Sequence, residues 1–503
     1  YIRVVMRRRP VGVSLSWLIL IFILPFAGAI LYFLIGEQRL GRQRAKRARE
    51  LLGPYEAWLH SLPSDTLVDW STLTPTCQPI NRLAESIMGI PAKFGNKLDL
   101  LHEAESVLRS IITDIDRAQR TCHLEFYIWN EGGPADEVCE ALIRAAKRGV
   151  ICRILIDAVG SAKFLKSGLA RRLRENGIEL IAALPVGLFR MVFARLDLRI
   201  HRKIVIIDGE VAYTGSLNLV DPRFFKQEEG VGQWVDAMVR LEGPAVQSLG
   251  VIFLWDWEVE TGQGIETLKD TSDLKALPLV GKASVQVVPS GPEVGNNPIH
   301  QLLLTSVYAA RRELIITTPY FVPDESLHSA LQSASRRGVD VTIILPEKVD
   351  SLLVRYASRS FFDDMLMSGI RILNFREGLL HTKSITIDGE VALFGTVNLD
   401  MRSFWLNFEV TLFVYDAVFV TRLRKLQQNY IEASQSIDSQ LWHTRSPANR
   451  FVENAAQLLA PLLRLGRKSK LNPRDAAPFL ILIVGIVLIL GLKLKPPEKD
   501  DSD

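Results

Sequence analysis

The sequence contains one segment twice, and this duplication limits the folds open to the chain more than any other feature. One copy runs from His201 to Ala212 and the other from His381 to Ala392; each has Lys two positions after His and ends in Asp-Gly-Glu-Val-Ala. At the same distance after each copy comes Gly-[Ser/Thr]-x-Asn, at 215–218 and at 395–398. Matching offsets in two copies are difficult to ascribe to chance, so we expect two homologous units.

The similarity extends upstream of both copies. Residues 146–150 and 335–339 contain basic residues and a glycine, and each precedes an apolar run, 152–156 and 341–345. This order is typical of a helix that ends at a glycine cap and leads into a buried strand. Strands are also predicted at 124–129 and 314–320. The fold class predicted is therefore α/β: two homologous α/β halves packed with the active site between them, plus membrane-associated helical ends.

A chain of 503 residues has room for three or four average domains. We predict instead two copies of one unit with additional ends. The boundaries are 1–50 for an N-terminal membrane segment with basic flanks, 51–95 for a linker, 96–265 for the first half, 266–285 for a linker, 286–445 for the second half, and 446–503 for an amphipathic helix, a short apolar segment and an acidic tail.

The apolar segment Val11–Gly36 has no charged residue and is long enough to cross a bilayer. For a single span, the basic residues favour the downstream flank as the cytoplasmic side only weakly, whereas a hairpin would leave both basic flanks on the anionic cytoplasmic face. Two alternatives to a single span are a hairpin that bends at Pro25 and returns, and a signal peptide cleaved near 27–29. The chain begins at Tyr1 rather than Met, so we expect an upstream segment.

Three other segments are candidates for contact with lipid. The stretch Ala476–Leu492 is apolar but short for a span, and the hydrophobic loop Leu184–Leu198 could lie at a lipid surface beside the active site. A helical stripe predicts either a helix along the lipid headgroups or a helix packed on the main body. Its members are Phe451, Ala455, Leu458, Leu459, Leu462 and Leu465.

Charge and cysteine content exclude several classes of protein. The net charge of +4 arises from 60 basic and 56 acidic residues, which is too balanced for a nucleic-acid-binding protein. The four cysteines lack the paired spacing of zinc sites. We therefore expect no metal, and reduced thiols in a cytoplasmic body.

The repeated motif carries groups suited to a phosphodiester. In a strand, His201 and Lys203 project from one face, as do His381 and Lys383, so an imidazole and an ammonium can meet one anion. The polar side chains after each hairpin could bind phosphate oxygens. These phosphate-binding candidates are Ser216, Asn218, Thr396 and Asn398.

One histidine could be neutral and nucleophilic while its twin, near acidic residues, stays protonated as a general acid. The two lysines would take the place of a metal in neutralising the phosphate, so no cofactor is needed. Asp208 and Asp388 complete the catalytic candidates. Both precede Gly between apolar strands, so they could form hairpin turns. Alternatively, they could orient the catalytic groups without touching the reacting atom.

Each histidine should be oriented by a carboxylate through its second ring nitrogen. For His381 we predict Glu409, in the strand-like segment 407–412. For His201 we predict Asp236, since the segment 234–239 has the same strand pattern; Glu229, which has the matching offset, is the alternative.

On several segments the chain resembles the phospholipase D superfamily, and within it the bacterial cardiolipin synthases. Beside the two motifs, the resemblance rests on Trp17–Gly36 with Gly41-Arg42, Phe126–Trp129, Val220–Arg223, Thr318–Pro323 and Leu399–Ser403. It implies conversion of two phosphatidylglycerol molecules to cardiolipin and glycerol through a phosphatidyl-histidine. It further implies His201 as nucleophile, His381 as acid and base, and a catalytic body on the cytoplasmic side of the bacterial inner membrane, an anionic phospholipid surface.

Two alternatives belong to other functional classes. A membrane-bound hydrolase of the same fold could cleave phospholipid or DNA, although balanced charge and apolar ends disfavour nucleic acid. A scaffold without activity would not need His, Lys and Asn in both copies.

Overall fold

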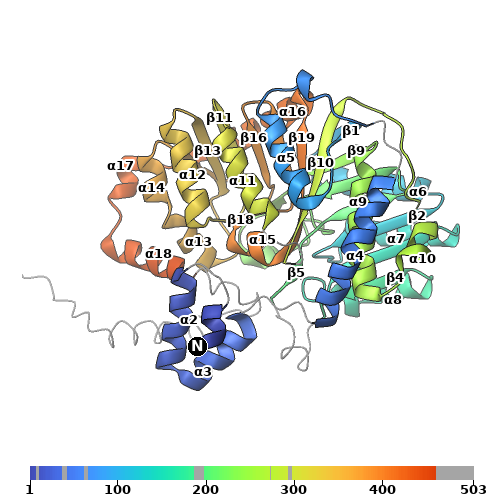
Figure 1. Ribbon diagram of the computed structural model, residues 1–503, viewed down its shortest axis with the longest axis horizontal. Helices are drawn as coiled ribbons and strands as arrows, with labels where there is room; N and C mark the ends of the chain where they lie inside the picture. Colours follow the sequence, from blue (N-terminus) through green and yellow to red (C-terminus); the bar gives the residue numbers. More distant parts are fainter. Residues whose placement is uncertain are drawn as a thin grey trace, which may run out of the picture. The chain divides into compact units, whose positions relative to one another are not determined.

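The computed structural model describes residues 1–6, 11–36, 42–61, 66–185, 197–271, 273–292 and 297–459 (Figure 1). These residues belong to one compact unit, Tyr1–Arg464. Its centre is one large mixed sheet in which both halves take part.

The first half contributes seven strands in the order β4-β3-β2-β6-β7-β9-β1. Strands β2, β3 and β4 are parallel, whereas the others pair antiparallel. Their bounds are β1 (Lys93–Leu101), β2 (Thr121–Phe126), β3 (Ile151–Asp157), β4 (Glu179–Ala183), β6 (Ile204–Ile207), β7 (Val211–Gly215) and β9 (Met238–Glu242).

The second half repeats this order as β14-β13-β11-β16-β17-β19-β10, with β20 (Ser434–Ser436) added at the edge. Strands β1 and β10 pair antiparallel and join the two halves. The predicted pair of homologous α/β halves is therefore confirmed. The bounds are β10 (Ala283–Ser290), β11 (Glu313–Thr317), β13 (Asp340–Pro346), β14 (Arg371–Phe375), β16 (Ser384–Ile387), β17 (Val391–Gly395) and β19 (Asn407–Tyr415).

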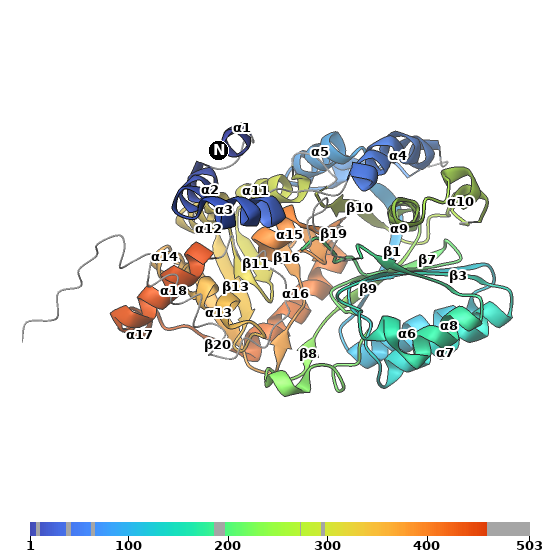
Figure 2. The same cartoon turned by 90° about the horizontal axis from the view of Figure 1, so that it is seen from below.

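Helices cover both faces of each half. Figure 2 shows α9 (Ala245–Thr261) and α10 (Ile265–Thr271) on one face of the first-half strands, opposite α6 (Ala104–Arg117), α7 (Pro134–Lys147) and α8 (Gly168–Glu175). The second half has α11 (Pro298–Ala309), α12 (Glu325–Arg336), α13 (Leu352–Arg359), α14 (Phe362–Met367), α15 (Met401–Trp405) and α16 (Ala417–Glu432). The predicted glycine caps are present: Gly149 and Gly338 have φ of 89° and 92°, and strands follow both.

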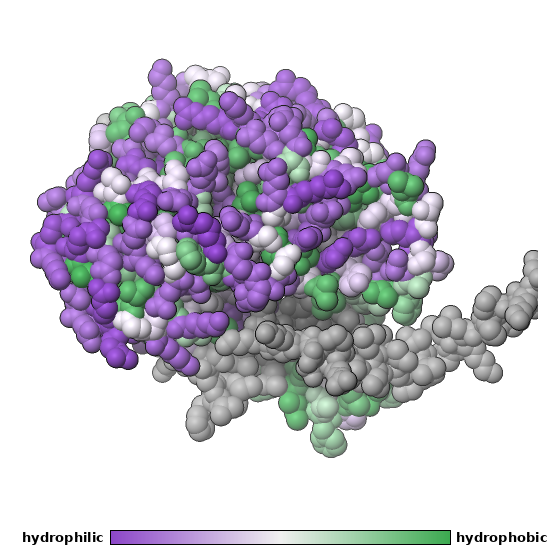
Figure 3. Space-filling model, turned by 180° about the vertical axis from the view of Figure 1, so that it is seen from behind, coloured by the Kyte–Doolittle hydropathy of each residue, from purple (hydrophilic) through white to green (hydrophobic). Residues whose placement is uncertain are grey.

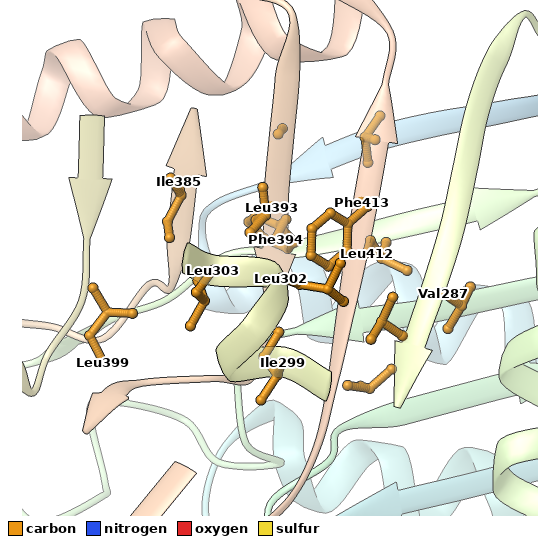
Figure 4. Packing of buried hydrophobic residues seen from close by; sticks show 14 of the residues in the cluster. Val287, Ile299, Leu302, Leu303, Ile385, Leu393, Phe394, Leu399, Leu412 and Phe413 are labelled. Carbon is orange, nitrogen blue, oxygen red and sulfur yellow. The ribbon is translucent and has the colours of Figure 1, made fainter. Parts of the chain in front are cut away.

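Hydrophobic packing supports the second motif from one side. In Figure 4, apolar side chains of α11 lie against β16, β17 and β19. The labelled residues in this contact include Ile299, Leu302, Leu303, Ile385, Leu393, Phe394 and Leu412. On the face of the body in Figure 3, by contrast, hydrophobic residues are scattered among hydrophilic ones.

The apolar N-terminal segment is a bent pair of helices rather than one continuous helix. After α1 (Ile2–Met6), α2 (Val11–Ile23) is followed by α3 (Pro25–Leu31) and a π-helical turn, Tyr32–Gly36. Among the helices that the structure describes, none is long and apolar enough to cross a bilayer. The apolar segment is interrupted before Pro25, because the residue before a proline avoids the helical region: Leu24 has φ −125° and ψ 76°.

The bend at Pro25 agrees with the hairpin alternative. A Cβ at Gly28 would lie 2.7 Å from the main-chain oxygen of Leu20, so α3 approaches α2 closely. Trp17 and Tyr32 pack edge to face with ring centroids 5.3 Å apart. Large apolar side chains remain on the outside of the hairpin, with Phe22 77% and Phe26 86% exposed.

The region expected to be a linker, 51–95, is largely structured. Helix α4 (Arg42–Ser61) runs along α9, where the hydroxyl of Tyr55 donates to Glu258 Oε2 at 2.8 Å. Helix α5 (Cys77–Met88) contributes Ile80 and Ala84 to the core. Cys77, Cys122, Cys139 and Cys152 are buried and unbonded to one another.

The C-terminal part that the structure describes ends in α17 (Ser439–His443) and α18 (Pro447–Leu459). Helix α18 packs through Glu453, which pairs with Arg359 at 2.8 Å, and Ala456, whereas Phe451 of the predicted stripe is exposed. The helix is therefore packed, with Phe451 outside the contact. The stretch 476–492, Leu462, Leu465 and loop residues 186–196 lie outside the described residues.

Candidate active site

Two very short strands carry the repeated motifs into the centre of the molecule. Strand β5 (Arg199–Ile200) precedes the first motif and pairs in parallel with β19 of the second half. Strand β15 (Leu379–Leu380) precedes the second motif and pairs in parallel with β8 (Trp234–Val235) of the first half. Each motif thus lies beside a strand that belongs to the other half.

Each histidine consequently takes its carboxylate from the other half. Nδ1 of His201 lies 2.7 Å from Glu409 Oε2, and Nδ1 of His381 lies 2.7 Å from Asp236 Oδ1. The two predicted carboxylates are correct, but the predicted pairing, Glu409 with His381 and Asp236 with His201, is wrong. The parallel strand pairs impose the crossing, because the amide of His201 donates to Phe408 O and that of His381 to Val235 O.

The alternative carboxylate, Glu229, is not used by either histidine. It lies in the 3-10 turn Gln227–Glu229 and pairs with Lys226 at 2.7 Å. Glu229 has the same offset from His201 as Glu409 has from His381, but the loop before Asp236 does not bring it to either ring.

The carboxylates fix the tautomer of both rings. An Nδ1–H that donates to Glu409 or Asp236 leaves Nε2 with its lone pair, which is the form required of a nucleophile or base. Both imidazoles are buried: His201 is 8% exposed and His381 3%. Aromatic rings cover them, with Tyr127 5.2 Å from His201 and Trp234 4.4 Å from His381 between ring centroids.

The two lysines are buried beside their histidines, as the strand spacing predicts. Nζ of Lys203 donates to His201 O at 2.6 Å, and Nζ of Lys383 donates to His381 O at 2.5 Å. The charge of Lys383 acts on the pKa of His201, and the charge of Lys203 acts on that of His381. The two motifs therefore form one electrostatic site.

Burial leaves both histidines neutral at pH 7. It lowers the pKa of His201 to about 4 and that of His381 to about 3, against the opposing effects of Glu409 and Asp236. The expectation that one twin rests in the protonated form is therefore wrong, because desolvation outweighs the adjacent carboxylate. Burial also lowers the pKa of Lys203 to about 8 and that of Lys383 to about 7.

Burial alone would raise the pKa of both carboxyl groups, yet the net direction is downward. For Glu409 the main opposing influence is His201, through its charge when protonated and through its hydrogen bond, followed by the charge of Lys203; for Asp236 it is His381 in the same two ways, followed by the charge of Lys383. The hydroxyls of Thr396 and Ser216 beside these carboxylates act in the same direction. Both carboxylates remain ionised.

Ser216 and Thr396 also hold the main chain of the carboxylate-bearing segments. The Ser216 hydroxyl donates to Ala237 O at 3.2 Å, and the Thr396 hydroxyl donates to Val410 O at 3.3 Å. The preceding glycine permits this approach, since a Cβ at Gly395 would lie 2.3 Å from Val410 O. Oδ1 of Asn218 accepts the amide of Ile128 at 3.2 Å. Asn398, two residues after Thr396, is also buried, with 3% of its surface exposed. Phosphate binding by these four side chains stays a prediction.

Asp208 and Asp388 form turns and do not touch the histidines or lysines. Asp208 has φ 51° and its carboxylate accepts the amides of Gln119, Arg120 and Thr121. Asp388 has φ 55° and accepts those of Arg311, Arg312 and Glu313. Each binds a hairpin to the loop before β2 or β11, as the turn interpretation predicts, and a catalytic role for either stays a prediction.

The sequence patterns did not predict the aromatic cover of the site. Tyr127 follows β2 and Trp234 lies two residues before Asp236, so both were within segments already recognised as strands. Nζ of Lys226 lies 5.6 Å from the Trp234 ring centroid and 3.4 Å from Asp350, which links the halves at this place. Among the described residues, no three His, Cys, Asp or Glu side chains are grouped as metal ligands.

Comparison with known proteins identifies relatives over nearly the whole chain. Residues 111–257 and 303–431 match the family model "Cardiolipin synthase, PLD-like domain", and residues 1–37 match "Phospholipase_D-nuclease N-terminal". Cardiolipin synthase A from Klebsiella pneumoniae is 46% identical over 92% of this chain and 95% of its own length, and the Yersinia pseudotuberculosis enzyme gives the same values. The crystal structure of a phosphatidylserine synthase from Haemophilus influenzae shares the fold, with a TM-score of 0.54, 15% identity and coverage of 77% of this chain and 98% of that one.

Substitution of Asp388 should affect stability and leave the chemistry intact. Asp388→Ala removes a charged acceptor of three amides, so we expect the free energy of unfolding to fall by about 2 kcal/mol or more. Asp388→Asn, which tolerates positive φ and keeps one acceptor, should lose less. Denaturant unfolding measures the effect. Unchanged stability together with lost turnover would show instead that Asp388 is catalytic.

The neutral histidines make stability fall in mild acid. In the unfolded chain these histidines take up protons with the ordinary pKa of about 6.5. In the folded state the pKa of His201 is about 4 and that of His381 about 3, so the folded state loses stability as the pH falls below 6.5. The double variant Asp236→Asn/His381→Gln lacks one of these rings and the carboxylate paired with it. Unfolding titrations from pH 7 to 4 should give a shallower decline for the variant, and equal slopes would contradict burial of a neutral His381.

Proposed function

The chain belongs to the cardiolipin synthase family of phospholipase D-like proteins, and on this basis we propose that it transfers a phosphatidyl group from one phosphatidylglycerol to another, giving cardiolipin and glycerol. One observation carries the proposal: two neutral histidines, each with a carboxylate on Nδ1, share one buried site with two lysines.

In the first step, Nε2 of His201 attacks phosphorus. A nitrogen–phosphorus bond forms, the bond to the glycerol oxygen breaks, and His381 gives that oxygen its proton. His381 rests neutral, with a pKa of about 3, so it must acquire this proton when substrate binds. The phosphodiester anion in a buried site favours that protonation, since a nearby negative charge raises the pKa of an imidazole.

In the second step, neutral His381 takes the proton of a glycerol hydroxyl on the second phosphatidylglycerol. The resulting oxygen attacks phosphorus, the nitrogen–phosphorus bond breaks, and His201 returns to its starting state. One phosphodiester replaces another, so the reaction needs no nucleotide. Lys203 and Lys383 neutralise the phosphate oxygens, with amide donors from Asn218 and Asn398 beside them.

Burial supports transfer to an alcohol rather than to water. His381 and Lys383 are each 3% exposed, and Trp234 covers the His381 ring. A site that excludes water protects the phosphatidyl-histidine from hydrolysis until the second lipid arrives.

A bacterial inner membrane with the catalytic body on its cytoplasmic face is the proposed location. The hairpin at 11–36 exposes Phe22, Phe26 and Ile30, which suits burial among acyl chains. Basic residues of α4 follow this hairpin, and anionic phosphatidylglycerol would attract them.

The proposed reaction has a direct test. Purified protein in mixed micelles with headgroup-labelled phosphatidylglycerol should release labelled glycerol and form cardiolipin with no nucleotide or metal added. If phosphatidic acid is the sole lipid product, the protein is a hydrolase and the proposal fails. Digestion of DNA without lipid turnover would point to the nuclease alternative.

The roles of the histidines can be separated by trapping the intermediate. His381→Ala should still accumulate phosphatidyl-protein from acyl-labelled substrate, while His201→Ala should form none, and both should turn over about 10³-fold more slowly or worse. Quenching in neutral detergent preserves the acid-labile nitrogen–phosphorus bond for gel analysis. Adduct in His201→Ala and none in His381→Ala would reverse the two roles.

A further inference from the structure

Arg202, between the histidine and lysine of the first motif, points away from the reacting groups into a buried cluster of charges. Its side chain is fully buried and pairs with Asp256 of α9. Its Nε donates to the main-chain oxygen of Glu409 at 3.0 Å. Arg202 therefore holds the very residue whose carboxylate binds His201.

A second arginine reaches the same place from α4. The guanidinium carbon of Arg44 lies 5.0 Å from the ring centroid of Phe408, and that of Arg202 lies 5.8 Å from it. Both distances are within the range of cation–π contacts. Phe408, the residue before Glu409 on β19, is thus in contact with two cations, and Arg44 is itself paired with Glu260 of α9.

The cluster contains two ion pairs. Two arginines face two carboxylates, Asp256 and Glu260. A third acid, Glu125, is also buried, and burial together with the charge of Asp256 raises its pKa well above the usual range. Removal of one member of a buried ion pair leaves an uncompensated charge, which is destabilising.

The second half has no such arrangement at the matching position. Thr382 stands where the first motif has Arg202, and its hydroxyl contacts Val235 O at 3.3 Å and the Tyr430 hydroxyl at 3.1 Å. The segment that supplies Asp236 is thus held at this position by neutral groups, with the Lys226 ammonium over Trp234 nearby, whereas the main chain of Glu409 is held by the Arg202 guanidinium, with Arg44 over Phe408.

We propose that Arg44 and Arg202 are positioning residues for His201: they hold β19 at Phe408 and so keep the Glu409 carboxylate on Nδ1 of His201. Arg44 lies on α4, the helix that follows the apolar hairpin. Through Arg44, α4 therefore affects the reaction in addition to joining the hairpin to the body. The expected effect on turnover rests on the proposed transfer reaction, but the tethering of β19 does not.

The test compares Arg44→Met, Arg44→Lys and the double variant Arg202→Met/Asp256→Asn, which leaves no unpaired carboxylate. Arg172→Met, at an exposed pair with Glu140, is the matched control. Kinetics in phosphatidylglycerol micelles give kcat and KM, and hydrogen exchange followed by mass spectrometry reports on peptides that span β19.

For Arg44→Met we expect kcat to fall about tenfold with KM within twofold of wild type, and faster exchange in β19. The double variant should behave likewise. Arg44→Lys should recover part of both effects, because an ammonium can also lie over the ring, and Arg172→Met should match wild type.

Two results would overturn the inference: unchanged kcat in both methionine variants, or lost kcat without faster exchange in β19. If wild type makes no cardiolipin, the proposed function fails separately. In that case, unchanged exchange of β19 in the methionine variants would still refute the tether.

Discussion

The exchange of carboxylates between the halves is the interaction on which the rest of the site depends. It follows from main-chain pairing: β5 lies in parallel with β19, and β15 with β8, so each motif is fixed to a strand of the other half before any side chain is considered. The hydrogen bonds from His201 to Glu409 and from His381 to Asp236 then set the tautomers. A shift of one half against the other would weaken both pairs together.

Burial determines the electrical state of this site. Two imidazoles, two ammonium groups and two carboxylates are buried, and desolvation lowers the pKa of both histidines despite their carboxylates. The resting enzyme holds its bases unprotonated, and the pKa of its lysines is lowered to about 8 for Lys203 and about 7 for Lys383. An anionic phosphodiester would raise the pKa of the imidazoles, so substrate and proton would arrive together.

The sequence predicted the duplicated fold, the His–Lys pairs and both carboxylates, since each depends on patterns within one segment. It did not predict the pairing, because β5 and β8 have two residues each and carry no periodicity that would assign them to the opposite half. Pro25 signalled the helix bend, and the Asp-Gly pairs signalled turns at Asp208 and Asp388. The sequence also contains an indication of the Arg202–Asp256 pair: Arg202 is next to an apolar strand, and Asp256 interrupts a helix that is otherwise mostly apolar.

Because of the crossed pairs, the two copies of the repeat depend on each other during evolution. After a duplication, one copy is usually able to decay while the other keeps the activity. Here loss of Asp236 would disable the histidine of the second copy, and loss of Glu409 that of the first, so neither copy can be spared. Selection must then preserve the shared residues on both sides, whereas positions outside the exchange, such as Arg202 and Thr382, were able to diverge.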